Sequence, residues 1–214
     1  MIAFAYAEAG PKNAAMYRSL ISGMVMSIRD TMPDEEIIML TDDDTPVVKE
    51  VNGIIRIPRT MPIMTWRLKC HQVAHAIGEN ILFTEPDVRF KANVMGEFAR
   101  DFDVAMTTRE EAVLLDNEEI NTPFTLGMTL SKSDEFWREA KLYCQTLDAK
   151  YQDWFGDIMA IAHVVNGGKF NVEILDGGEF NHVVNDPAEQ SDAKVLHYKG
   201  KRKNFLFDVI KEAA

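Results

Sequence analysis

The chain has 214 residues, a net charge of −11 and 46% hydrophobic residues, which is enough for a substantial core in one large domain or two small ones. The acidic charge repels phosphate backbones and disfavours nucleic-acid binding as the main activity. No basic segment precedes the apolar amino terminus, and no apolar run approaches the ~18 residues of a membrane span. We therefore expect a cytoplasmic protein without a membrane span.

The first ninety residues alternate between strand and helix patterns. Buried strands are expected at 2–7, 36–41, 54–57 and 80–84, because short apolar runs are typical of strands covered on both faces. Apolar residues three and four apart predict helices at 15–28 and 66–77, the second closed by Gly78 as its C-cap. This order predicts an α/β fold with a mainly parallel sheet flanked by helices.

The second half of the chain is less regular. Strands are expected at 102–106, 124–130, 170–175 and 193–198, and helices around Phe98 and at 133–147, 153–165 and 204–214. Residues 107–122 are polar and acidic, and are either a lid or an ordinary surface loop. Cys70 and Cys144 lie in predicted helices and are expected to be buried free thiols, rather than a disulfide or metal site. One domain spanning 1–214 is the simplest organisation.

Two acids follow the predicted strand at 80–84. Glu85 and Asp87 are separated by Pro86, which stiffens the turn. The carboxyl end of such a strand is where open α/β sheets bind ligands, and two hard oxygen ligands could share one divalent cation. Alone, the pair is equally consistent with a solvated strand end.

A second candidate site begins at the last predicted strand. His197 closes this strand, Gly200 follows three residues later, and Lys203 three after that. Imidazole is a suitable ligand for a manganese-like ion, a glycine lets backbone approach a phosphate, and a lysine supplies a point charge to phosphate oxygens. A basic surface loop or a nucleic-acid patch are the alternatives.

Two further charged residues lie near aromatic side chains. Arg67 follows Trp66 near the start of a predicted helix, where it could face an anion. Asp157 follows Trp154, Phe155 and Gly156. A solvated cation and a helix N-cap are the respective structural alternatives.

The order of these motifs resembles that of the GT-A type nucleotide-sugar glycosyltransferases. The similarity is greatest to the retaining group that includes glycogenin and the bacterial lipopolysaccharide galactosyltransferases, and to its short members often encoded by phages. Glu85-Pro86-Asp87 corresponds to the family's Asp-x-Asp motif. His197, Gly200 and Lys203 match its closing His-x-x-Gly-x-x-Lys motif in identity and spacing.

The resemblance implies a role for each of these residues. Glu85, Asp87 and His197 would hold a divalent cation, Mn²⁺ or Mg²⁺. The nucleotide sugar, with a uridine diphosphate sugar as the expected donor, would be bound by Ala5, Tyr6, Arg67, Gly200 and Lys203. Asp157 would be the catalytic residue, orienting sugar hydroxyls or an unknown acceptor.

Three positions depart from the family pattern. Glu85 replaces an aspartate, Thr125 lies in a segment without the family's asparagine, and Ile158 replaces a glutamine. Asn121 lies four residues too early to supply that asparagine. These changes indicate either an altered donor or acceptor, or a catalytically weak or inactive protein that binds a nucleotide sugar or a protein partner.

Overall fold

A computed structural model describes residues 1–8, 10–109, 113–115, 118–120 and 123–206. Its centre is a seven-stranded sheet in the order β10-β6-β9-β4-β1-β2-β3. The strands are β1 (Ile2–Ala5), β2 (Ile37–Thr41), β3 (Gly53–Arg56), β4 (Ile81–Thr84), β6 (Val104–Thr108), β9 (Phe124–Ser131) and β10 (Val172–Leu175). Only β9 runs antiparallel to its neighbours, β4 and β6. The mixed, mainly parallel α/β sheet expected from the sequence is confirmed.

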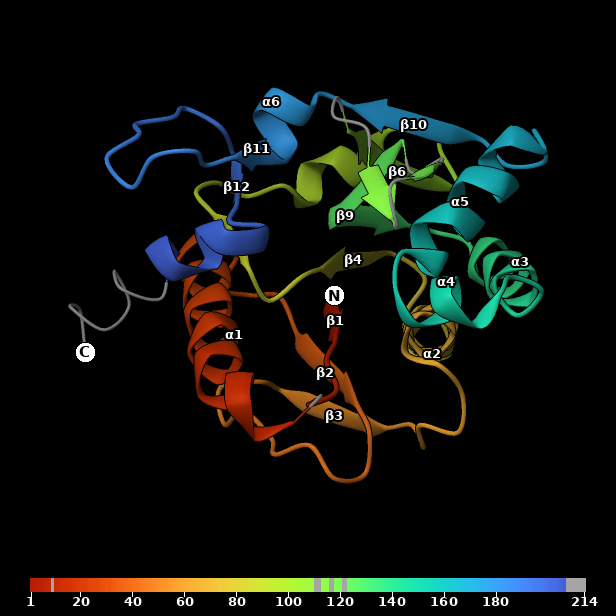
Figure 1. The fold of residues 1–214 in the computed structure, drawn as a ribbon. Coiled ribbons are helices and arrows are strands. Elements are labelled where there is room, and N and C mark those ends of the chain that lie inside the picture. The colour runs from red at the N-terminus through yellow and green to blue at the C-terminus, as the bar shows by residue number, and fades with distance from the viewer. Residues whose placement is uncertain (9, 110–112, 116–117, 121–122, 207–214) are drawn as a thin grey trace.

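Helices cover both faces of this sheet (Figure 1). Helix α1 (Pro11–Thr31) packs on one face, and α2 (Ile63–Ala74), α3 (Asp134–Cys144) and α5 (Gly156–Asn166) pack on the other. Ala3 and Phe83 belong to the core beneath α2, whereas Ile2, Phe4 and Leu82 belong to the core beneath α1. Alternate side chains of a strand point to opposite faces, so strands covered on both faces must be apolar throughout.

A smaller sheet positions the last part of the chain. It consists of β11 (His182–Val183), β12 (Val195–His197) and β5 (Val88–Phe90), in the order β11-β12-β5. β5 follows β4 after a short turn, and β12 pairs with it antiparallel so that His197 lies opposite Val88. This register brings the end of the chain to the residues that follow β4.

The predicted helix at 66–77 is shifted. α2 begins at Ile63, directly after Pro62, and its C-cap is His75 rather than Gly78. Pro62 is the N-cap of α2, and a proline is compatible with this place because N–H groups at a helix start have no partner within the helix. The start of α3 is as expected, because the Ser133 hydroxyl accepts a hydrogen bond from Phe136 N at 3.2 Å.

The predicted helix at 153–165 is α5, which starts three residues later than expected, and the short helix before it was not predicted. α4 (Ala149–Asp153) ends before Trp154, and α5 starts at Gly156. The break is at Phe155, whose φ is 67°, a value that a right-handed helix excludes. A hydrophobic period cannot reveal such a local backbone change.

Other segments add short elements. The described part of 107–122 contains an antiparallel hairpin of β7 (Val113–Leu115) and β8 (Glu118–Ile120). The sequence did not predict β11 or α6 (Gly177–Phe180), and the helix around Phe98 is the 3-10 helix η1 (Met95–Ala99). Of the predicted terminal helix, residues 207–214 lie outside the described residues. Both cysteines are buried and free, as expected. None of the helices within the described ranges combines the length and hydropathy needed to cross a bilayer.

Candidate metal and diphosphate site

The turn between β4 and β5 carries the two acids. Glu85 follows the last residue of β4, and Asp87 precedes the first residue of β5. Backbone hydrogen bonds fix both ends of the turn, because Glu85 N donates to Gly127 O at 3.2 Å and Tyr198 N donates to Asp87 O at 2.9 Å. The two carboxylates therefore lie at the carboxyl end of the central sheet, where open α/β sheets bind ligands.

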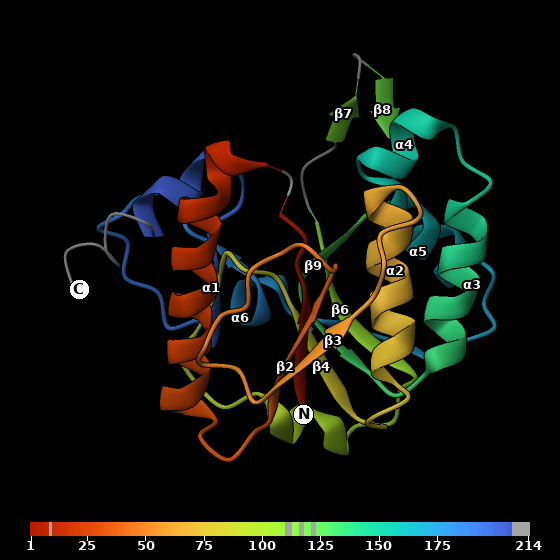
Figure 2. The ribbon, with the colours of Figure 1, turned by 90° about the horizontal axis from the view of Figure 1, so that it is seen from below.

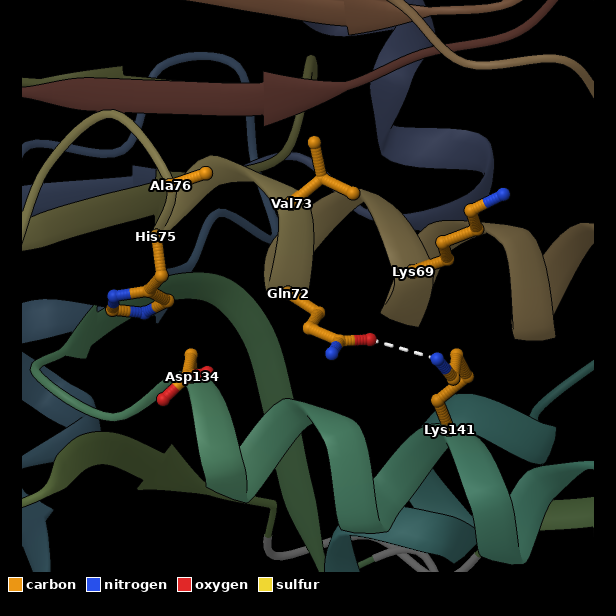
Figure 3. A pocket seen from close by; sticks show the side chains of 7 residues that line it. All are labelled: Lys69, Gln72, Val73, His75, Ala76, Asp134 and Lys141. Carbon is orange, nitrogen blue, oxygen red and sulfur yellow. Dashed lines mark hydrogen bonds between the residues drawn. The ribbon is translucent and has the colours of Figure 1, made fainter.

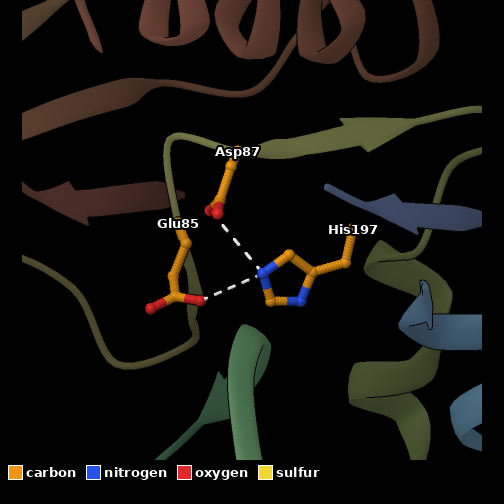
Figure 4. A group of neighbouring side chains, drawn as sticks. All are labelled: Glu85, Asp87 and His197. Atoms are coloured by element: carbon orange, nitrogen blue, oxygen red, sulfur yellow. Dashed lines mark ion pairs between the residues drawn. The ribbon is translucent and has the colours of Figure 1, made fainter. Parts of the chain in front are cut away.

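His197 joins these acids from the other end of the sequence. Its Nε2 atom lies 3.4 Å from Glu85 Oε2 and 3.6 Å from Asp87 Oδ1 (Figure 4). One ligand atom from each of the three residues lies within 4.8 Å of the others. Asp87 and His197 are 4% and 3% exposed, so the group has little access to bulk water. Two carboxylate oxygens and one imidazole nitrogen form a donor set that suits Mn²⁺.

Asn181 fixes the orientation of the imidazole. His197 Nδ1 lies 2.9 Å from Asn181 Oδ1, and both residues are buried. An amide oxygen can only accept, so Nδ1 donates in this hydrogen bond, which turns Nε2 toward the two carboxylates. Such a hydrogen bond to the distal nitrogen is usual for metal-binding histidines. Sequence reasoning missed Asn181, which no motif marks.

Gly127 on β9 makes room for this pair. A Cβ atom at Gly127 would lie 2.4 Å from Asn181 Oδ1 and 2.5 Å from His197 Nδ1, well inside van der Waals contact. Gly127 is therefore required because two side chains approach its backbone closely, not because its backbone adopts a conformation that favours glycine.

Two cations neutralise the acids. Lys203 Nζ lies 2.6 Å from Asp87 Oδ2, and the Arg67 guanidinium pairs with Glu85. Burial alone would raise the pKa of Asp87, but His197 and Lys203 hold that pKa well below its usual value. Burial would lower the pKa of Lys203, but Asp87 raises it above the ordinary lysine value. Both groups are therefore charged at neutral pH.

Asp157 extends the site toward α5. It lies in the first turn of that helix, is 1% exposed, and its Oδ2 atom is 3.2 Å from Arg67 Nη1. Burial raises the pKa of Asp157, and the Arg67 guanidinium opposes this shift. Arg67 thus connects Asp157 to Glu85. It lies in the second turn of α2, not at the helix end that the sequence suggested.

The remaining predicted nucleotide-binding residues lie at the same edge of the sheet. Ala5 is the last residue of β1. Tyr6 follows it and stacks on Tyr17 of α1 with ring centroids 5.7 Å apart. Burial, followed by the nearby charge of Glu8, raises the pKa of Tyr6 to about 12. Gly200 has a φ of 66° and begins the 3-10 helix η2 (Gly200–Arg202), so its backbone requires a glycine.

A hollow of about 280 Å³ lies beside the ends of β1 and β2. Its lining combines acids and bases, namely Glu8, Arg18, Asp42, Asp44, Thr45, Pro46 and Arg59. Asp42 accepts a hydrogen bond from Thr45 N at 2.9 Å and lies 3.8 Å from Arg59 Nε. Among the described residues, Glu8 Oε2 is buried and has no hydrogen-bond partner.

The three departures from the family pattern differ in position. Glu85 is itself one of the three candidate metal-binding residues, with Asp87 and His197, which we call the acidic group. Thr125 is buried in the sheet, where its hydroxyl lies 2.7 Å from that of Thr107. Ile158 is 8% exposed and belongs to the core beneath α2. Asn121 lies outside the described residues.

A second hollow, of about 340 Å³, lies between α2 and α3 (Figure 3). Its walls are Lys69, Gln72, Val73, His75, Ala76, Asp134 and Lys141, and Gln72 accepts a hydrogen bond from Lys141 at 2.7 Å. None of these residues belongs to the acidic group. This hollow is therefore separate from the candidate site.

The mixed sheet with helices on both faces is the GT-A fold, which this chain shares with solved glycosyltransferase structures. Solved structures that share it include the galactosyltransferase LgtC in complex with donor and acceptor sugar analogues, with 16% identity, a TM-score of 0.56, and 99% of this chain and 95% of that chain covered. A glycosyltransferase involved in glycosylation of the major capsid of PBCV-1 gives 13% identity, a TM-score of 0.62 and 98% coverage of both chains.

The bifunctional glycosyltransferase WbbM covers 99% of this chain with 48% of its own length, at 12% identity and a TM-score of 0.61. No protein-family description matches the sequence, and neither does any curated protein sequence. The likeness is therefore one of fold, and the chemistry has to be argued from the residues of this chain.

Proposed function

We propose that this protein is a metal-dependent glycosyltransferase, which moves a sugar from a nucleoside-diphosphate donor to an acceptor. One observation carries the proposal. At the carboxyl edge of the sheet, the turn after β4 supplies Glu85 and Asp87, and the distant end of β12 supplies His197. One ligand atom from each of the three lies within 4.8 Å of the others. The GT-A fold of the chain supports the same assignment.

The cation proposed for this site is Mn²⁺ or Mg²⁺. Hard carboxylate oxygens suit both ions, and the imidazole nitrogen favours Mn²⁺. A cation held there supplies Lewis-acid stabilisation of the charge that develops on the departing diphosphate, typically several kcal/mol. Lys203, 2.6 Å from Asp87, is within reach of the same phosphates.

The hollow beside β1 and β2 supports a uridine nucleotide as donor. Uracil presents one N–H donor between two carbonyl acceptors. Asp42 can accept a hydrogen bond, whereas Arg18 and Arg59 can donate, and all three line the hollow. Its volume of about 280 Å³ is just below the range of about 300–1,000 Å³ for small-molecule sites.

Transfer exchanges one bond for another at the anomeric carbon. The bond from that carbon to the diphosphate oxygen breaks, a bond to the acceptor hydroxyl oxygen forms, and the hydroxyl proton leaves for the diphosphate or solvent. Asp157 is proposed to orient the sugar hydroxyls, and its ion pair with Arg67 at 3.2 Å would hold it in position. Arg67 also forms an ion pair with Glu85.

The experiment is a panel of UDP-, GDP-, ADP- and CDP-sugars incubated with the protein and Mn²⁺, Mg²⁺ or chelator. We expect metal-dependent release of UDP, and loss of that release in Asp87→Asn and His197→Ala. Circular dichroism should show that both variants remain folded. Binding of UDP with Mn²⁺ but no release would favour the alternative, a nucleotide-sugar-binding protein without turnover. The absence of both UDP binding and UDP release would contradict the proposal.

A further inference from the structure

One of the three tryptophans is exposed. Trp66 and Trp137 are 1% and 0% exposed, whereas Trp154 is 57% exposed. Large aromatic side chains usually bury most of their surface in the fold. Trp154 is therefore the residue whose indole ring most needs an explanation outside the core.

The backbone beside Trp154 is strained and tightly packed. Phe155 has a φ of 67°, and among the described residues it is the only one besides glycines with a positive φ. A bulky residue in this region is uncommon and is often found at functional sites. A Cβ atom at Gly156 would lie 2.4 Å from the carbonyl oxygen of Tyr151. The backbone that connects α4 to α5 is thus restricted, and the Trp154 ring lies edge-on to that of Phe155 with ring centroids 5.5 Å apart.

This connection lies at the active end of the molecule. Figure 2 shows α4 at the same end as the first turns of α1 and α2, beyond which the hairpin of β7 and β8 projects. Trp154 is three residues before Asp157, whose ion pair with Arg67 leads to Glu85. One short rigid turn therefore carries both the exposed indole and a buried carboxylate of the candidate site.

We propose that Trp154 is a stacking platform for a pyranose ring of a saccharide acceptor. The proposal rests on the proposed function, because it concerns the molecule that receives the sugar. An indole presents a flat apolar face, which matches the C–H face of a pyranose, and its N–H can bond a hydroxyl at the ring edge. The net charge of −11 disfavours a polyanion such as a nucleic acid on this surface, so a neutral glycan is the ligand favoured.

The arrangement also suits transfer. A ring stacked on Trp154 presents its hydroxyl groups at its rim, close to the turn that begins α5. The anomeric carbon of the donor would then exchange its diphosphate oxygen for one of these hydroxyl oxygens, with the bond and proton changes already described. Trp154 itself takes no part in the chemistry and acts by positioning the acceptor.

Tryptophan fluorescence tests this inference independently of activity. Because Trp66 and Trp137 are buried, acrylamide quenching reports mainly on Trp154. The probes are lactose, maltose, cellobiose and chitobiose, and a serine-rich peptide, each titrated with Mn²⁺ and UDP present. We expect at least one disaccharide to protect the fluorescence saturably, and Trp154→Phe to abolish this signal. Protection by the peptide alone, or by none of the probes, would overturn the proposal.

Kinetics supply the second readout. In Trp154→Ala we expect kcat/KM for the responding disaccharide to fall about 10-fold or more, mainly through KM, because the stacked ring would contribute to acceptor binding. Trp154→Phe should retain part of this efficiency. Donor hydrolysis, in which water replaces the acceptor, should be unchanged. The control is Leu142→Ala on α3, where a side chain 54% exposed should be neutral in both assays.

The two proposals fail in different ways. If the protein shows no metal-dependent UDP binding and no donor hydrolysis, the proposed function fails, whatever the saccharides do to the fluorescence. If donor hydrolysis is intact but Trp154→Ala transfers sugar as well as the wild type, only the role of Trp154 fails. An equal fall in hydrolysis and transfer would also contradict it, because it would place Trp154 in donor binding or folding.

Discussion

His197 donates its Nδ1 hydrogen to Asn181 Oδ1 over 2.9 Å, and this bond aims Nε2 at Glu85 and Asp87. Both partners are buried, so water cannot replace the bond at low cost. The relationship explains how a histidine at a strand end is held in one orientation toward the two acids. It leads to two predictions about residues that touch no metal.

Replacing Asn181 by alanine should weaken Mn²⁺ binding by ~10–100-fold, the usual effect of losing the hydrogen bond behind a ligating histidine. The loss arises because His197 can then rotate or change tautomer. Calorimetric titration with Mn²⁺ measures it, with Asn166→Ala, at an exposed position at the end of α5, as the control. Unchanged affinity in Asn181→Ala would remove the positioning role.

Replacing Gly127 by alanine should disturb the same pair by a steric route. The new methyl group would lie 2.4 Å from Asn181 Oδ1 and 2.5 Å from His197 Nδ1, so one of them must move. We expect weaker Mn²⁺ binding and a lower melting temperature. Gly96→Ala is a matched control, because nothing lies within 4 Å of its added Cβ. Equal behaviour of the two variants would contradict the packing argument.

Lys203 should have opposite effects on metal and nucleotide. Its Nζ atom is 2.6 Å from Asp87 Oδ2, so a cation must displace it when no phosphate is present. Lys203→Met should therefore tighten Mn²⁺ binding to the free protein and weaken UDP binding in the presence of Mn²⁺. Each change should be roughly 5–30-fold, which corresponds to one or two kcal/mol.

Paired calorimetric titrations measure both changes in Lys203→Met. Lys201→Met, at an exposed position of the same loop, is the control. The opposite signs separate this account from a merely structural role, since damage to the fold would weaken both ligands. A fall in both affinities would therefore count against the proposed competition.

His71 should make the stability pH-dependent. It is 3% exposed, packs on the rings of Phe83 and Trp137, and its Nδ1 atom lacks a hydrogen-bond partner among the described residues. Burial lowers its pKa well below 6.5, and Arg67 adds to the shift. A folded pKa below the unfolded one gives stability that is complete above about pH 6.5 and is lost as pH falls.

The free energy of unfolding should then decrease below pH 6.5 by up to about 1.4 kcal/mol per pH unit from this residue. His75 shifts in the same direction, mainly through burial, and adds to the slope. Urea unfolding at several pH values measures it, and His71→Leu should reduce the slope while leaving the contribution of His75. A flat profile between pH 6.5 and 5 in the wild type would contradict the account.

Much of the sheet could be predicted because its strands are short apolar runs bounded by turns. The acids after β4 were recognisable as a strand end, and His197, Gly200 and Lys203 by their spacing. The pairing of β12 with β5, which brings His197 opposite Val88, depends on tertiary contacts that no local pattern records. The sequence therefore predicted the members of the acidic group but not why they meet.

Other parts of the site had no sequence signal. Asn181 follows a four-residue helix and acts only through His197. The positive φ of Phe155, which separates α4 from α5, had no signal in the hydrophobic pattern. The pairing of Arg67 with both Glu85 and Asp157 likewise appears only when α2, β4 and α5 are assembled.

The most direct test of the central claim is calorimetric titration of UDP with and without Mn²⁺. The wild type should bind UDP at least ~10-fold more tightly with Mn²⁺, since Glu85, Asp87 and His197 would hold the cation and its charge would offset that of the diphosphate. Asp87→Asn and His197→Ala should each abolish this enhancement and retain the fold. Equal UDP affinity with and without Mn²⁺ in the wild type, or an enhancement that survives both substitutions, would contradict the account.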